Sequence, residues 1–177
     1  MAEELFRRER LQPSLLDRLT ESAPEHRRES LEQQTLTMTQ LRQAVLRDLA
    51  WLLNTTNLGA TEDLSLFPRV ADSALNFGVP GFTGLIAESQ RVADLEAAIA
   101  DAIRRFEPRI RPETVRVQAR ARAGDENRIG RSLIFEISGE LWGQPVPQEL
   151  FLETEIDIET RLAVVADAAG ANRKALR

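Results

Sequence analysis

The residues in this 177-residue chain best placed to do chemistry are Glu107 and Arg109, which flank Pro108. An acid and a base two positions apart point to the same side of an extended chain, so together they could hold a partner's backbone or charged side chains. The structural alternative is a helix end with two solvated charges, which contribute little energy. The spacing leaves both interpretations open, and the first predicts recognition rather than catalysis.

Groups suited to catalysis are scarce elsewhere. The chain has no cysteine, which excludes thiol catalysis, disulfides and thiolate metal sites, and its one histidine, His26, lies in a run of charged residues where we expect it to be solvated. A peptidoglycan glycoside hydrolase is the alternative function, because such an enzyme needs two carboxylates and acids are plentiful. However, Arg109 would hold Glu107 ionised, whereas a general acid must carry a proton. We therefore predict no catalytic residue, no cofactor and no metal ion.

Composition and net charge narrow the remaining classes of function. The chain is 42% hydrophobic and 29% charged, which is typical of a soluble globular protein, and it has no apolar run long enough to span a membrane. Charged residues near the start argue against a signal peptide, so we predict a cytoplasmic protein. The net charge of −5 disfavours nucleic acid as a partner. A regulatory or nucleic-acid-binding adaptor that uses Arg116, Arg120 and Arg122 as a basic face is a further alternative. The absence of aromatic residues interleaved with these arginines, on which bases could stack, argues against it.

Pro108 and its two charged neighbours should form a sharp turn, here called the corner. Two amphipathic helices should position it. The first covers 41–53, and the second ends at Phe106, because Pro108 disfavours helical geometry in the residue before it. The apolar faces comprise Leu41, Val45, Leu49, Leu52 and Leu53 in the first helix and Val92, Leu95, Ile99, Ala102 and Phe106 in the second. We expect Trp51 to be buried, and Arg47 and Asp48 to face either solvent or a partner. A shorter helix is predicted over 68–77, with Gly78 as its left-handed terminator.

Beyond the corner, the apolar period changes from 3.6 to 2. Alternation over 115–123, 133–138 and 150–158 predicts three strands in an antiparallel meander with one apolar face and open edges. On the other face, Arg116 and Arg120 could pair with Glu136 across the strands or form part of an interaction surface.

The predicted fold class is therefore α+β, with N-terminal helices packed on a small antiparallel C-terminal sheet. Residues 1–37 are interpreted as an extended N-terminal arm, 38–159 as a single domain and 160–177 as a polar C-terminal tail.

Three segments in this order resemble one family. They are Leu-Arg-Asp-Leu-Ala-Trp-Leu-Leu-Asn at 46–54, Leu-Asn-Phe-Gly-Val-Pro at 75–80 and Phe-Glu-Pro-Arg-Ile at 106–110. Together they resemble TssE, the baseplate subunit of the bacterial type VI secretion system. That family is similar to a wedge subunit of contractile-tailed phage baseplates and is also labelled lysozyme-like.

The resemblance implies a structural role in an injection machine. The chain would be a noncatalytic baseplate component that links wedge and hub proteins and nucleates the sheath, at a baseplate docked on the inner membrane. Its partners would be other baseplate wedge proteins, a hub or spike protein and sheath subunits, which would exchange strands with the sheet. The assembly contact of the family carries over to Glu107, Pro108 and Arg109. Arg47 and Asp48 are further partner-binding candidates.

Overall fold

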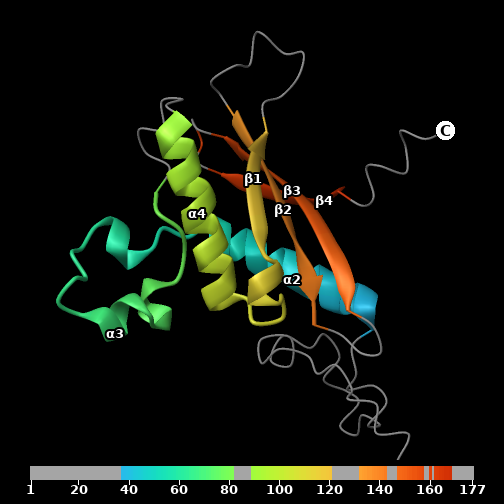
Figure 1. The fold of residues 1–177 in the computed structure, drawn as a ribbon, viewed down its shortest axis with the longest axis horizontal. Coiled ribbons are helices and arrows are strands. Elements are labelled where there is room, and N and C mark those ends of the chain that lie inside the picture. The colour runs from blue at the N-terminus through green and yellow to red at the C-terminus, as the bar shows by residue number, and fades with distance from the viewer. Residues whose placement is uncertain are drawn as a thin grey trace, which may run out of the picture.

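The computed structural model describes residues 37–81, 89–120, 132–142, 147–157, 160 and 162–168. Its helices are α2 (Met38–Leu53), α3 (Pro68–Ala71) and α4 (Ser89–Phe106), with 3-10 turns η2 (Leu58–Ala60), η3 (Ala74–Asn76) and η4 (Pro112–Thr114). The strands are β1 (Arg116–Arg120), β2 (Ser132–Leu141), β3 (Gln148–Asp157) and β4 (Ala163–Asp167). Helices precede an antiparallel sheet, which confirms the α+β class (Figure 1). The predicted arm up to residue 36, His26, Arg122 and the last nine residues lie outside the described ranges.

Helix α2 confirms the first predicted helix and begins three residues earlier than expected. Thr37 caps it: the Thr37 hydroxyl accepts from the Gln40 N–H at 3.2 Å, and the Gln40 side chain accepts from the Thr37 N–H at 2.9 Å. This reciprocal capping box satisfies two backbone donors that would otherwise lack partners. The predicted apolar stripe is buried as expected.

Helix α4 ends at Phe106, where the proline was predicted to stop it. Leu95, Ile99 and Ala102 are buried in the core, and Phe106 is packed against it. The steric effect of Pro108 therefore sets the position of the corner.

The single helix predicted over 68–77 is wrong, because the chain forms α3 and then a separate turn, η3. Ser73 separates them: its hydroxyl accepts from the Leu75 N–H at 3.2 Å and so starts a new turn. Gly78 has the expected positive φ, at 121°. A Cβ there would lie 2.3 Å from the Thr55 carbonyl oxygen, so only glycine fits.

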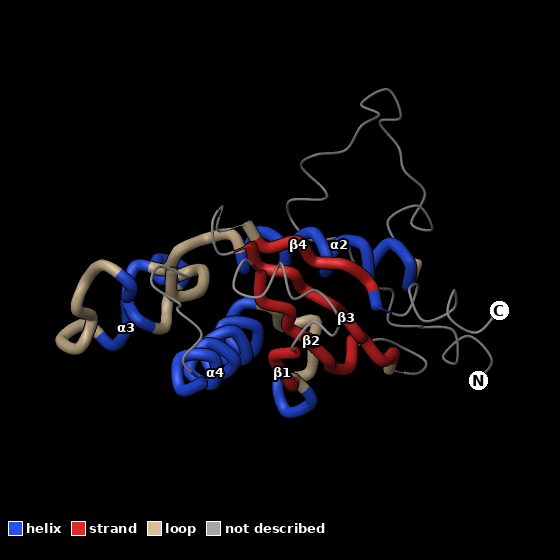
Figure 2. The backbone as a smooth tube through the Cα atoms, turned by 90° about the horizontal axis from the view of Figure 1, so that it is seen from above, coloured by secondary structure: helices blue, strands red, loops and turns tan. Residues whose placement is uncertain are grey.

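The sheet has four antiparallel strands in the order β1-β2-β3-β4, one more than predicted. Strand β4 lies in the stretch interpreted as a tail, and it was missed because Ala-Val-Val-Ala does not alternate apolar and polar residues. One face of the sheet packs with α2 and α4 into a single core, with α4 nearest β1 and α2 nearest β4 (Figure 2). The short α3 lies in a lobe away from the sheet.

On the other face, the predicted cross-strand pairing is confirmed for Arg120 and Glu136, whose Nε and Oε2 atoms are 2.9 Å apart. Arg116 instead donates to the carbonyls of Glu113 and Val115, each at 3.0 Å. None of the described helices is both long and apolar enough to cross a membrane.

Candidate functional site

The corner predicted at Pro108 is a tight turn fixed at both ends. The Glu107 N–H still donates to Ile103 in α4 at 2.9 Å, and the Ile110 N–H closes the turn on the Glu107 carbonyl at 3.1 Å. The turn also joins the sheet, because the Trp142 N–H donates to the Arg109 carbonyl at 2.7 Å just beyond β2. Helix α4 and strand β2 therefore hold the corner from two directions.

Glu107 is not solvated, since only 4% of its side chain is exposed. Its Oε1 accepts from the Arg109 Nε at 2.6 Å and from the Arg109 backbone N–H at 3.1 Å, and its Oε2 accepts from the Arg109 Nη2. The two side chains thus form a bidentate ion pair. An arginine suits this position because its planar guanidinium matches both carboxylate oxygens. Both side chains do point to one side, as predicted, but there they bind each other.

The pair extends into a chain of four charges. The Arg109 Nη2 also donates to Asp48 on α2, 61 positions away in the sequence, and the other oxygen of Asp48 accepts from the Arg47 Nε at 2.9 Å. Burial alone lowers the pKa of Arg109, but its hydrogen bonds and attraction to Glu107 and Asp48 outweigh that effect and raise it above the ordinary value. Arg109 is therefore permanently charged and joins α2 to the corner.

Trp51 was expected in the core, but it is half exposed. It lies outside the buried stripe of α2, and the Arg47 guanidinium covers its ring at 5.2 Å from the ring centroid, a cation–π contact. The ring forms one wall of a hollow of about 430 Å³ beside the corner. The hollow is lined by Asp48, Leu49, Trp51, Leu52, Phe77, Phe106, Glu107, Pro108 and Arg109.

Phe106 and Phe77 build the aromatic floor of this hollow, with ring centroids 5.3 Å apart in an edge-to-face arrangement. The structure thus brings four of the five predicted site residues to one apolar hollow. The fifth, Arg47, reaches it through Trp51 and Asp48.

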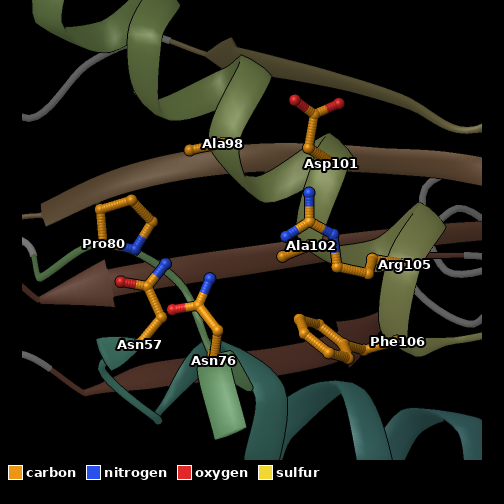
Figure 3. A pocket seen from close by; sticks show the side chains of 9 residues that line it. Asn57, Asn76, Pro80, Ala98, Asp101, Ala102, Arg105 and Phe106 are labelled. Carbon is orange, nitrogen blue, oxygen red and sulfur yellow. The ribbon is translucent and has the colours of Figure 1, made fainter. Parts of the chain in front are cut away.

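A second hollow, of about 160 Å³, lies where Phe106 meets Arg105 and Asn76 (Figure 3). Its polar groups largely hold the fold together. The Asn76 side chain bridges the Gly59 N–H and the Ala71 carbonyl at 2.9 Å each, and Arg105 donates to the same carbonyl at 2.7 Å. This hollow contains none of the predicted site residues.

The corner offers poor chemistry for a hydrolase. All four oxygens of its two carboxylates, on Glu107 and Asp48, accept hydrogen bonds from the guanidinium groups of Arg109 and Arg47, so these oxygens are already engaged within the protein. Among the described residues, no group of three or more side chains could hold a metal ion. The arrangement is suited to binding.

Two exposed tryptophans beside the corner were not among the predicted site residues. Trp51 lines the hollow, and Trp142, also half exposed, directly follows β2 and donates its own N–H to the Arg109 carbonyl. A signal for Trp51 exists in the helical periodicity, because it falls outside the apolar stripe that its neighbours define. Exposed tryptophans are frequent at the centres of protein interfaces.

Three comparisons with known proteins bear on this site. The family model described as baseplate wedge protein gp25 matches residues 39–146, which include α2 from its second residue onward, α4, the corner and β2. Comparisons with curated proteins and with solved structures give no match. The matched range contains the three segments at 46–54, 75–80 and 106–110 and confirms their resemblance to this family.

Proposed function

We propose, because this chain belongs to the baseplate wedge protein gp25 family, which includes TssE, that it is a noncatalytic subunit of a type VI secretion baseplate. Members of this family are structural components of baseplates, which supports baseplate proteins as its partners. The finer proposal is that the helical half contacts wedge and hub proteins while the sheet nucleates the sheath. The baseplate would be cytoplasmic and docked on the inner membrane.

The observation that carries the proposal is the apolar hollow at the charged corner. Pro108 and Trp51 are exposed at its rim, while Glu107 is buried beneath them. A large apolar side chain of a wedge protein would fill the hollow, and the tryptophan would act as a hot spot for binding. Glu107 would contribute indirectly by fixing Arg109, whereas Pro108, Arg109, Arg47 and Asp48 would contact the partner.

The charged side chains at the rim would fix the orientation in which this partner binds. Arg47 and Asp48 are only partly buried, so a partner can reach them without leaving an unpaired charge in the core. Polar groups around an apolar centre fix register, whereas the centre supplies most of the affinity.

The test compares two exposed aromatic residues. Trp51→Ala should leave the protein folded but abolish co-purification of the other baseplate proteins when they are co-expressed with it. Phe67→Ala, which removes an exposed aromatic side chain from the lobe near α3, is the matched control and should co-purify them normally. In cells, sheath assembly seen by fluorescence microscopy should fail only in the first variant.

Two results would overturn the assignment of the contact. Normal co-purification by Trp51→Ala would move the contact away from the hollow. Failure of both variants to bind while both remain folded would show that aromatic residues on both surfaces matter and that the corner is not the single docking site.

A further inference from the structure

The outer face of the sheet, which is the face away from α2 and α4, carries a groove that takes no part in the proposed function. The groove has a volume of about 400 Å³ and lies over β1, β2 and β3, beside the residue that follows β4. Its one exposed apolar side chain is Phe151, which is half exposed, whereas the neighbouring Leu150 and Leu152 point into the core. The groove is lined by Arg116, Gln118, Arg120, Glu136, Ile137, Ser138, Phe151, Leu152 and Ala168.

The outer face of β3 is acidic next to this groove. Glu149 and Glu153 are exposed there, on either side of Phe151. No side-chain hydrogen bond or ion pair of either glutamate is found among the described residues. Glu153 also lies directly opposite Glu136 of β2, and like charges in such a position destabilise a sheet. Because Arg120 pairs with Glu136, Glu153 is left without an opposite charge in the part of the chain that the structure describes.

The chain itself leads to this groove. Ala168, which follows β4, is part of the lining, and the register of β4 on β3 brings it level with Phe151. Residues 169–177 come next and are here called the C-terminal segment. Leu176 is its one large apolar residue, and it has three basic residues and no acidic one. The basic residues are Arg173, Lys174 and Arg177. The C-terminal segment therefore starts beside the groove and carries the charge that Glu149 and Glu153 lack.

The C-terminal segment is long enough to cover the groove. Leu176 is eight residues beyond Ala168. An extended chain spans about 3.3 Å per residue, so Leu176 can lie up to about 26 Å from Ala168. Neighbouring strands are only about 4.8 Å apart, which brings all of the groove within reach. Gly170 lets the chain turn back toward β3 at the start of the segment, because glycine adopts backbone conformations that other residues avoid.

We propose that the C-terminal segment folds back onto the outer face of its own sheet. Leu176 packs against Phe151 in the groove, which removes apolar surface of both from water. The basic side chains lie beside Glu149 and Glu153, on the β3 side, because the arginines of β1 would repel them. The tether gives the segment a high effective concentration, so contacts too weak to hold a separate peptide can hold it. A partner that binds this face must first displace the segment. The inference goes beyond the proposed function and does not depend on it.

Spin labelling tests the proposal, because the chain has no cysteine and a single introduced cysteine can be labelled alone. The full chain is labelled with ¹⁵N, and a nitroxide is attached to the variant Ala175→Cys. The amide signals of Phe151 and Ser138 should lose most of their intensity, because a nearby nitroxide broadens them. A nitroxide on Arg69→Cys is the control and should leave both signals unchanged, because α3 lies in the lobe away from the sheet (Figure 2).

Further substitutions in the labelled chain separate the charged contact from the apolar one. Arg173→Glu combined with Lys174→Glu should abolish the broadening, and adding Glu153→Lys should restore it, because the charges are then exchanged. Phe151→Ala should abolish the broadening of the remaining groove signals. Val164→Ala is the matched control: it removes exposed apolar atoms from β4 on the same face of the sheet and should keep the broadening.

The proposal fails on any of three results. Groove signals that the label at Ala175 leaves unchanged would show that the C-terminal segment lies elsewhere. Broadening in a mixture of spin-labelled ¹⁴N chain and unlabelled ¹⁵N chain would place the segment of a second copy in the groove. Broadening by a label on Ser14→Cys, without broadening by the label at Ala175, would assign the groove to the N-terminal arm. Each result can occur whether or not Trp51→Ala abolishes co-purification of baseplate proteins, so the two proposals fail separately.

Discussion

Two glutamates, Glu107 at the corner and Glu96 on α4 beside the edge strand β1, show how differently one residue type can be used. Glu107 is buried and both of its oxygens are held by Arg109. Glu96 is partly exposed and one of its oxygens accepts a single backbone N–H. Removing Glu107 leaves the partly buried guanidinium of Arg109 without its main partner, whereas water can replace Glu96 as the acceptor for its one backbone N–H. Glu107 is therefore part of the fold, whereas Glu96 makes a single hydrogen bond that can be replaced.

The largest expected effect is at the corner. Glu107→Ala should lower the free energy of unfolding by about 3 kcal/mol, because it leaves Arg109 partly buried without its main partner. Urea unfolding followed by circular dichroism measures this loss. A loss below about 1 kcal/mol would mean that Arg109 turns to solvent and that the pair contributes little to the fold.

An intermediate effect is expected one step along the charge chain. Asp48→Ala should lower the free energy of unfolding by about 1 kcal/mol, since Arg109 keeps both bonds to Glu107 and Asp48 is partly exposed. A double-mutant cycle with Arg47→Ala measures whether the two residues act together. Strictly additive losses would show that Arg47 stacks on Trp51 without help from Asp48.

The smallest effect on stability is expected at β1, the edge strand of the sheet. Glu96→Ala should change the free energy of unfolding by about 0.5 kcal/mol, because water can replace the carboxylate at the Ala119 N–H. Hydrogen exchange at Ala119 should become faster while that of Ile137 in the core stays slow. If Glu96→Ala were as destabilising as Glu107→Ala, the two glutamates would not differ in role, and Glu96 would also be a structural residue.

The local elements could be predicted because their causes are local. The stripe in α2, the end of α4 before Pro108 and the positive φ of Gly78 each follow from side-chain spacing or from backbone sterics. The break between α3 and η3 was missed because a single Ser73 hydroxyl competes with a weak helical pattern. Strand β4 was missed because its short apolar run carries no period, and pairing with β3 makes it a strand.

The site could be predicted only in part, for the same reason. The motif at 107–109 identified the corner, and its spacing predicted that the acid and the base share a side. Nothing in that spacing shows that Asp48 lies within reach of Arg109 or that Trp51 is left outside the core. Both depend on how α2 packs against the corner.

The sequence by itself determined where helices end, which residues face the core and that the chain belongs with baseplate wedge proteins, because periodicity, proline and motif order are properties of neighbouring residues. Only the tertiary structure decided that Glu107 is buried, that Trp51 is exposed and that Glu96 on α4 accepts from the Ala119 N–H of β1. Those outcomes depend on contacts between segments far apart in the chain, and burial and pairing are set where such segments meet.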